Sequence, residues 1–431
     1  MKIGIIGGGI MGLSLAYRLS QKGHKVTVFE SSQQLGGLAT YHDFGAFVWD
    51  RFYHVILPSD KYLIQFIKDI GLADQLRWRA TLTGCYINKK LYSISNTLEF
   101  FLFPPLTFIG KLRLAFTLLY GSRINNWQRL EKIPVEDWLL RISGKNAYEK
   151  LWKPLLLAKL GENYKRVSAV FIWSYIKRLF SARDSSLHKE QLGYIAGGYK
   201  TVFDRLANLI HAASGEIRTG VAVEYIAPHS EKGIWVESNS KKEHFDKVIF
   251  TAPVNVLQQV AAKDLVQIAG DGATVEYLGV ICMGLITRKA LVPYYIVNVA
   301  DQQIPFTGVL GMSNLVSRQE TAGLHLTYFP KYVHSDDPLL KKSDEELRNL
   351  FFQGLRLMFP DLQVENIVSA HINRAMKMQP LQVLNYSQLV PKVLTEHEDF
   401  YVLNTSQFLN DTLNNNTVVH HVDEFVSQFH F

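Results

Sequence analysis

Within the first forty residues the spacing of hydrophobic positions changes from that of a buried strand to that of a helix and back to that of a strand. Residues 2–6 form a short apolar run, which predicts a parallel strand buried on both faces. Apolar residues then recur at helical spacing over residues 10–22, and Gly23 ends this predicted helix. A second apolar run, residues 25–29, predicts another strand that ends at Glu30. The chain therefore begins with a predicted strand–helix–strand unit.

Three glycines occupy the turn between the first strand and the helix. Gly7, Gly9 and Gly12 have the spacing G-x-G-x-x-G. In a nucleotide-binding turn the first glycine allows the tight turn, the second lets the backbone approach a pyrophosphate, and the third lets the helix pack close to the strand. Glu30 stands where a carboxylate accepts hydrogen bonds from ribose hydroxyls. The unit predicts a site for NAD or FAD, and a purely structural glycine-rich turn is the weaker alternative.

A pair of glycines, Gly36 and Gly37, follows directly after this unit. The stretch LGGLAT resembles the second signature of a superfamily of FAD enzymes that includes amine oxidases, protoporphyrinogen oxidases, phytoene desaturases and UDP-galactopyranose mutases. The resemblance implies that the pair lies along the pyrophosphate and ribityl chain of FAD. Many members have Arg after the pair, whereas this chain has Leu38. Neither Cys85 nor Cys282 lies in the C-terminal segment where some amine oxidases attach flavin, so FAD is expected to be non-covalent.

Later segments resemble other FAD-binding parts of the same superfamily. Residues 193–253 resemble its second FAD block, in which the residue at Val223 presents its backbone to the adenine. Near the C-terminus the superfamily has Gly-Asp, which is replaced here by Asn404 and Thr405, and an Asn run precedes the last predicted helix. The FAD-binding residues implied by the motifs and the resemblance are Gly7, Gly9, Ile10, Met11, Gly12, Glu30, Ser31, Gly36, Gly37, Leu38, His54, Val223, Thr251, Ala252, Pro253, Asn404 and Asn416.

The order of these segments predicts an α/β protein of two interleaved domains. A Rossmann-like FAD-binding domain of the glutathione-reductase type is expected to take residues 1–58, 191–258 and 396–431. An α+β substrate domain is expected to take residues 59–190 and 259–395. Strand-like runs at 277–287, 294–300 and 323–328 would build a sheet facing the flavin.

Three residues are candidates for a catalytic role. The resemblance places His54 over the flavin ring, where an imidazole could act as a hydrogen-bond donor, and a structural histidine in a turn is an equal alternative. Arg374 lies in a segment that resembles one passing beside the flavin, and a surface arginine is the alternative. Tyr328 ends one of the predicted strands.

Composition excludes several classes of protein. The 431 residues carry a net charge of +7, and the basic residues are spread along the sequence, which argues against a nucleic-acid partner. Two cysteines provide no disulfide framework and no zinc cluster, so no metal is expected and a reducing compartment is favoured. No apolar stretch reaches the ~20 residues that span a bilayer. We expect a cytoplasmic protein, with peripheral contact to the inner face of the membrane as an alternative.

The segment 98–120 has two interpretations. Its aromatic residues, its Pro pair and a helix that contains Lys111 and Arg113 resemble the patches by which some relatives reach substrates in the lipid phase. Alternatively, the segment lines the core of the substrate domain, which is favoured because apolar residues continue around most of the helix.

The leading hypothesis is an FAD-dependent oxidoreductase that transfers a hydride between flavin and a largely hydrophobic or lipid-linked small molecule, by oxidation, desaturation or saturation. One alternative is a non-redox enzyme on a sugar nucleotide, similar to UDP-galactopyranose mutase, which would need a pair of arginines for the pyrophosphate. Another is a flavin-binding protein without activity, suggested by Leu38 and by Phe52 where Gly is usual in the superfamily. The sequence leaves the electron acceptor open.

Overall fold

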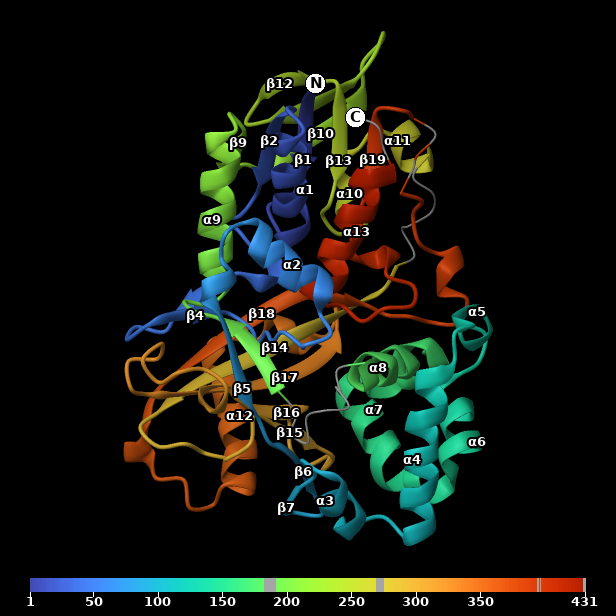
Figure 1. The fold of residues 1–431 in the computed structure, drawn as a ribbon, viewed down its shortest axis with the longest axis vertical. Helices are drawn as coiled ribbons and strands as arrows, with labels where there is room; N and C mark the ends of the chain where they lie inside the picture. Colours follow the sequence, from blue (N-terminus) through green and yellow to red (C-terminus); the bar gives the residue numbers. More distant parts are fainter. Residues whose placement is uncertain (182–190, 269–274, 394, 396, 429–431) are drawn as a thin grey trace.

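A five-stranded parallel sheet forms the centre of the nucleotide-binding unit (Figure 1). The computed structural model describes residues 1–181, 191–268, 275–393, 395 and 397–428. The sheet has the order β19-β13-β1-β2-β9, and every neighbouring pair is parallel. Its strands are β1 (Lys2–Ile6), β2 (Lys25–Glu30), β9 (Glu216–Thr219), β13 (Lys247–Phe250) and β19 (Phe400–Val402). The sheet therefore joins three distant parts of the chain.

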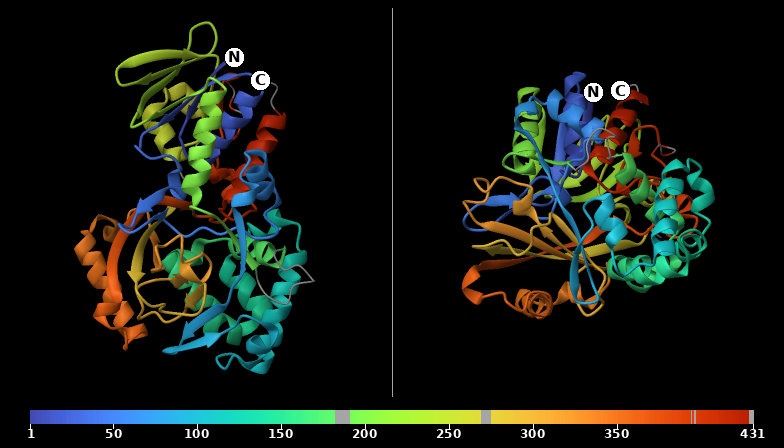
Figure 2. Two further views of the ribbon diagram at one scale, coloured as in Figure 1. Left: turned by 60° about the vertical axis from the view of Figure 1, so that its left-hand side comes forward. Right: turned by 60° about the horizontal axis from the view of Figure 1, so that its bottom comes forward.

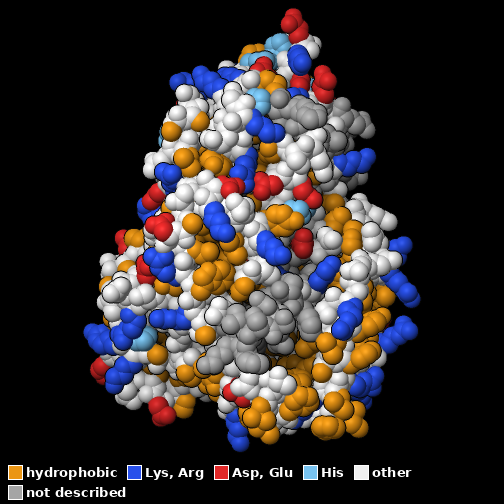
Figure 3. Space-filling model, in the orientation of Figure 1, with side chains coloured by type: hydrophobic (Ala, Val, Ile, Leu, Met, Phe, Trp, Pro, Cys, Tyr) orange, Lys and Arg blue, Asp and Glu red, His pale blue; other side chains and the backbone are white. Residues whose placement is uncertain are grey.

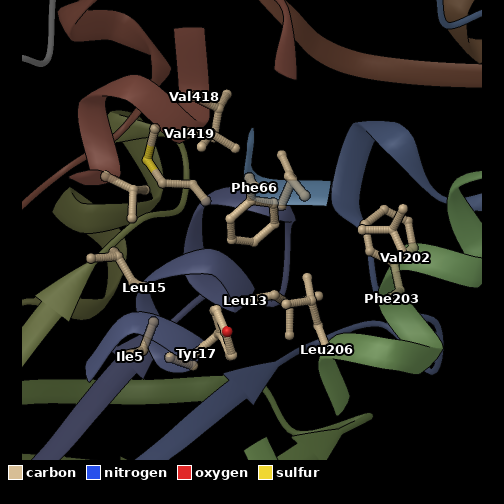
Figure 4. Packing of buried hydrophobic residues seen from close by; sticks show 14 of the residues in the cluster. Ile5, Leu13, Leu15, Tyr17, Phe66, Val202, Phe203, Leu206, Val418 and Val419 are labelled. Carbon is tan, nitrogen blue, oxygen red and sulfur yellow. The ribbon is translucent and has the colours of Figure 1, made fainter. Parts of the chain in front are cut away.

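Helices cover one face of this sheet. α1 (Ile10–Gln21) packs against α9 (Tyr199–Ala212) and α13 (Asn415–Gln428), and α13 also packs against α2 (Lys61–Asp69). Figure 4 shows Leu13 and Leu15 of α1 among Phe66 and Val419 from the neighbouring helices. Burial of each such side chain contributes about 1.5–3 kcal/mol, so this cluster fixes the helix start that carries the glycine motif.

A small antiparallel sheet and two short helices cover the opposite face. The strands β10 (Val223–Pro228), β11 (Ile234–Ser238) and β12 (Lys241–Phe245) lie in this order. Their buried residues share a cluster with Phe29, Val248 and Phe250 of the parallel sheet. The two helices are α10 (Val254–Val260) and α11 (Lys263–Ile268).

The second unit is built on a seven-stranded sheet of order β18-β14-β17-β16-β15-β6-β7. Its long central strand β14 is buried at every position, which explains its continuous apolar sequence. The helix α12 (Asp344–Met358) begins in a capping box and packs on this sheet through Phe351 and its neighbours. The strands are β6 (Thr83–Ile87), β7 (Lys90–Ser93), β14 (Tyr277–Thr287), β15 (Ile296–Val299), β16 (Gly308–Gly311), β17 (His325–His334) and β18 (Ile367–Pro380).

A group of helices stands beside the seven-stranded sheet (Figures 1 and 2). In this group α4 packs against both α6 and α8, and α7 packs against β17 of the sheet. Trp173 and Tyr148 are fully buried at its centre. The helices are α3 (Thr97–Leu102), α4 (Phe108–Arg123), α5 (Trp127–Leu130), α6 (Val135–Ala147), α7 (Lys153–Leu160) and α8 (Ala169–Ser181).

The outer face of α3 and α4 is apolar and exposed. Leu114, Thr117 and Gly121 of α4 are buried against the helix group, so the interpretation of 98–120 as core holds for one face only. The other face exposes 69% of Leu98 and 68% of Phe108. Figure 3 shows hydrophobic side chains gathered at the lower right, where Figure 1 places these helices. The exposed large side chains here are Leu98, Phe101, Leu102, Phe108, Ile109, Leu112, Phe116, Leu119 and Tyr120, which we call the α3–α4 face.

The chain passes back and forth between the two units through extended connections. Two short antiparallel pairs lie along these connections: β3 (Tyr41–Asp43) with β4 (Val48–Asp50), and β5 (Leu76–Ala80) with β8 (Gln191–Ile195). The predicted boundary at residue 58 falls before α2, yet Leu63, Phe66 and Ile67 of α2 pack in the nucleotide-binding core. Before α2, however, Phe44 and Trp49 already pack in a cluster with Val280 of the seven-stranded sheet, so the chain enters the second unit and returns. The division into two interleaved domains and its boundaries stay a prediction. The α/β class with a Rossmann-like FAD-binding sheet is confirmed by the fold.

Candidate functional site

A cavity of about 1730 Å³ extends from the nucleotide-binding unit into the second unit. Its wall begins at the β1–α1 turn and continues along one face of the seven-stranded sheet. It then passes α7 and α8 and reaches the helices α3 and α4. Most of the predicted FAD-binding residues line it: Gly7, Gly9, Ile10, Met11, Glu30, Ser31, Gly36, Gly37, Leu38, His54, Val223, Thr251, Ala252 and Pro253.

The β1–α1 turn requires glycine at two of its positions for different reasons. Gly7 has a φ of +116°, in the region that side chains rarely adopt. A Cβ on Gly12 would lie 1.9 Å from the carbonyl oxygen of Gly7. Gly12 does not line the cavity, so its part is to let α1 approach the strand.

Glu30 is held at the end of β2 by two backbone amides. The amide of Gly8 donates to one carboxylate oxygen at 2.7 Å, and the amide of Ser32 donates to the other at 2.8 Å. These bonds fix the carboxylate beside the glycine turn, on the cavity wall. The position suits an acceptor for ribose hydroxyls.

The turn fits the pyrophosphate of a dinucleotide. Gly9 is the N-cap of α1 and provides no side-chain cap, so the positive end of the helix is left for an anion. Gly9 also forms a parallel bridge with Gly36, which brings the two glycine motifs together. A Cβ on Gly9 would meet its nearest atom, Cα of Gly37, at 3.9 Å. The space beside Gly9 is therefore not filled by other protein atoms and is open to a ligand.

His54 lines the cavity beside a buried carboxyl group. Its Nδ1 lies 3.8 Å from a carboxylate oxygen of Asp50, and the other oxygen of Asp50 accepts from the amide of Tyr199 at 2.7 Å. Burial raises the pKa of Asp50 to about 7 and lowers the pKa of His54 to about 4. At neutral pH His54 is therefore a neutral imidazole, able to hydrogen-bond a ligand without carrying charge.

Tyr328 is not on the cavity wall. The side chain is fully buried, and its hydroxyl donates to the backbone carbonyl of Asp50. Desolvation holds its pKa well above the ordinary value, so it remains a phenol. Its hydrogen bond secures the segment that carries His54, which is a positioning role and not contact with a ligand.

Arg374 also lies away from the cavity wall. Its guanidinium forms an ion pair with Asp344 at 2.6 Å and donates to the carbonyl of Lys342 at 2.7 Å. These bonds connect β18 to the start of α12, in agreement with the surface alternative. The structure does not bring Arg374 to the cavity wall, because Asp344 and the carbonyl of Lys342 bind its guanidinium instead.

Arg374→Gln is expected to leave FAD binding unchanged and to lower the free energy of unfolding by about 1 kcal/mol or less, because both partners are partly exposed. Flavin content and urea unfolding of the purified variant measure the two effects. Loss of flavin in this variant would show that Arg374 reaches the cofactor.

Near the C-terminus the cavity is lined by sequence neighbours of the predicted residues, and not by the predicted residues themselves. The side chain of Asn404 is buried and accepts from the amide of Ser406 at 2.9 Å, which caps a short 3-10 helix. Asn416 accepts from the amide of Leu63 at 3.1 Å. Neither lines the cavity, whereas Thr405, Asn414 and Asn415 do. Both predicted residues form hydrogen bonds within the protein. Polar residues next to them in the sequence line the cavity instead.

Several lining residues were missed by the sequence analysis. Lys159 of α7 and Lys377 of β18 are the lysines on the wall, and Tyr53 and Tyr332 meet there through their hydroxyls. The signal for Lys159 is a stripe of residues 151, 155 and 159 at helical spacing, with a lysine where the pattern calls for an apolar residue.

Comparison with known proteins assigns the chain to a family. The model of the flavin containing amine oxidoreductase family matches residues 10–374, and the chain belongs to that family. It is therefore an FAD-dependent oxidoreductase.

Relatives and structural neighbours agree with this assignment. A 4,4'-diapophytoene desaturase (4,4'-diaponeurosporene-forming) of Staphylococcus haemolyticus is 36% identical over 66 residues, 15% of this chain and 13% of that protein. A 15-cis-phytoene desaturase of Synechococcus elongatus is 30% identical over 81 residues, 19% of this chain and 17% of that protein. The chain thus matches less than a fifth of the length of each of these curated relatives.

The solved structures match over nearly the whole chain. An oxidoreductase from Methanosarcina mazei has a TM-score of 0.76 at 20% identity, covering 99% of this chain and 100% of that one. A reduced UDP-galactopyranose mutase has a TM-score of 0.75 at 15% identity, covering 100% and 96%. A putrescine oxidase bound to putrescine has a TM-score of 0.75 at 13% identity, covering 99% of both chains. At these identities the likeness shows the fold.

Proposed function

We propose that this oxidoreductase acts on a long hydrophobic small molecule, by oxidation, desaturation or saturation. The observation that carries the proposal is that one continuous cavity connects the glycine turn with the α3–α4 face. Its wall beyond the glycine turn is mainly apolar, with Leu155 and Phe171 on one side and Val280 and Leu310 on the other. An extended hydrocarbon would fill such a space and exclude water from it.

The residues of the wall would act mainly by positioning. Bound FAD would supply the hydride acceptor or donor. Apart from Glu30, which its two amide bonds hold at the nucleotide end, no carboxylate is present on the described wall. His54 is neutral and could accept or donate one hydrogen bond. The wall therefore favours hydride transfer from an oriented carbon over a reaction that needs a strong base.

The desaturase relatives support a hydrophobic substrate, since their names describe enzymes that act on diapophytoene and phytoene. The mutase alternative receives less support. It requires a pair of arginines for a pyrophosphate, and Arg374 is bound to Asp344 outside the cavity.

Spectroscopy of the purified protein tests the proposal. We expect a reducible flavin band that disappears with anaerobic dithionite, and FAD released on denaturation. Incubation with a polyene precursor such as phytoene should then change the chromophore of the substrate, with reoxidation by oxygen or a quinone followed separately. The mutase would be favoured if the flavin exchanges no electrons with the hydrophobic substrates and the protein instead isomerises a sugar nucleotide.

We also propose that the α3–α4 face docks on an anionic lipid bilayer. Residues 97–181 contain 14 Lys and Arg against 6 Asp and Glu, a net charge of +8, whereas the whole chain has +7. This excess lies in the one stretch of chain that forms α3 to α8, beside the exposed apolar face (Figure 3). Apolar side chains flanked by cations are typical of a surface that lies in a lipid interface. None of the described helices has the length and apolar character needed to cross a bilayer.

A triple variant of α4 tests the docking. Phe108, Ile109 and Phe116, each more than half exposed, are replaced by Ser. We expect sedimentation with vesicles of mixed phosphatidylcholine and phosphatidylglycerol to fall at least about tenfold, since each side chain loses apolar burial in lipid. Leu357→Ser, at an exposed position of α12, is the matched control. Wild-type protein that binds no vesicles, or a control that loses as much as the triple variant, would contradict the docking.

A further inference from the structure

Lys159 places a cation on a cavity wall that is mainly apolar. It lies near the end of α7, on the wall, and its Nζ is 3.2 Å from the centroid of the Tyr332 ring. We propose that Lys159 binds the anionic end of an amphiphilic substrate, a carboxylate or a phosphate attached to a long hydrocarbon chain. This inference rests on the proposed function, because it names the chemistry of the substrate's polar end.

The ammonium group has no carboxylate partner among the residues that the structure describes. Among the described residues, no Asp or Glu oxygen lies within ion-pair distance of Lys159, although Lys153 on the same helix pairs with Glu149. The aromatic face of Tyr332 replaces part of the lost hydration through a cation–π contact. Burial nevertheless lowers the pKa of Lys159 to about 7. A ligand anion would satisfy the charge that the protein leaves without a counterion.

The charges of the described part of the wall point in the same direction. Among the described residues, those with charge on the wall are Glu30, Lys159 and Lys377, and Glu30 is held at the nucleotide end by two amides. The described wall that faces the seven-stranded sheet and the helix group thus carries two lysines and no carboxylate. Such a wall discriminates against a cationic substrate and favours an anionic one.

Lys159 is placed close to the segment that carries His54. The hydroxyls of Tyr332 and Tyr53 share a hydrogen bond, and Tyr53 precedes His54 in the chain. Only the rings of Tyr332 and Tyr53 would then separate the anionic end from the segment that is predicted to face the flavin. Carbon atoms next to the anionic group, and not the far end of the chain, would then be oriented for reaction.

The apolar chain has a route outward along the same helix. Leu155 and Lys159 lie four residues apart on α7, and Leu151 lies in the π-helical turn that precedes α7; all three line the cavity. Leu151 packs against a cluster that contains Leu114 of α4 and two residues of the α3–α4 connection, Phe103 and Leu106. A lipid could keep its tail toward the α3–α4 face while its anionic end reaches Lys159.

Binding of three chain-matched probes to the FAD-loaded protein tests the inference. Dodecyl phosphate, dodecanoate and dodecanol are titrated below their micelle concentrations by calorimetry. We expect at least one anion to bind about tenfold or more tightly than dodecanol, as for a hydrogen bond to a charged group. Lys159→Met should reduce the affinity for that anion to the level of dodecanol, and Lys159→Arg should retain most of it. The stronger of the two anions identifies the head group.

Control variants separate this site from general charge effects. Lys153→Met removes a cation from the same helix but outside the cavity, and should leave all three affinities unchanged. Equal affinities for the three probes in the wild type would overturn the inference, as would an equal loss in Lys153→Met or a loss confined to Lys377→Met. A Lys159→Met variant that shifts the reduction potential of the flavin while keeping the anion preference would overturn it too. Failure of the proposed function is distinct, since it would appear as absence of FAD or of substrate redox chemistry.

Discussion

The Gly9→Val variant is expected to fold normally and to lose FAD. Gly9 has φ −73° and ψ 178°, an extended conformation that valine adopts readily. A Cβ there meets no protein atom closer than 3.9 Å, so the new side chain enters the space between the two glycine motifs. That space is where the N-terminus of α1 would meet the pyrophosphate. We expect flavin content to fall at least about tenfold, measured as absorbance at the flavin band and as FAD released on denaturation.

Gly12→Val provides the contrast within the same motif. Its Cβ would lie 1.9 Å from the carbonyl oxygen of Gly7, so α1 could not keep its place against β1. This variant is expected to lose both FAD and native unfolding cooperativity, whereas Gly9→Val should keep its circular dichroism and its unfolding transition. Normal flavin retention in folded Gly9→Val would show that the pyrophosphate lies elsewhere.

The parts of the candidate site whose local geometry could be predicted from the sequence are those formed by residues close together in the chain. The β1–α1 turn depends on residues within a few positions of one another, and Glu30 follows at the end of the next strand. Such spacings are visible in the sequence because the backbone conformation itself requires glycine. The family resemblance added the approach of Gly36 and Gly37, which the structure places against Gly9.

Side chains whose surroundings depend on distant segments were harder to predict. Arg374 was a candidate for the site, but its partner Asp344 lies thirty residues earlier on another element. Lys159 was missed because its environment comes from Tyr332, far along the chain on β17. Helical periodicity likewise could not tell which apolar face of α4 is buried, since both faces carry hydrophobic residues. In each case the deciding contact is tertiary.

The Asp50→Asn variant is expected to be more stable than the wild type at pH 8. Asp50 is buried, and the removal of water raises the pKa of its carboxyl group to about 7. In the unfolded chain that pKa lies near 3.8. Between these values the folded protein binds a proton that the unfolded chain has released, so the contribution of Asp50 to stability is lost as the pH rises through about 7. Asparagine cannot ionise, and its carbonyl oxygen can still accept from the amide of Tyr199.

The gain should therefore grow between pH 4 and pH 7 and level off above that range. A separation of about three pKa units sets an upper value of about 4 kcal/mol at pH 8. Urea unfolding of the FAD-loaded protein at several pH values measures it as the difference between variant and wild type. His54 contributes in the opposite direction, because its pKa is lowered to about 4, so its share of the stability is lost as the pH falls from about 6.5 toward 4. Subtracting the two curves removes that share to a first approximation. A difference that does not change with pH would mean that the pKa of Asp50 is not raised in the folded protein.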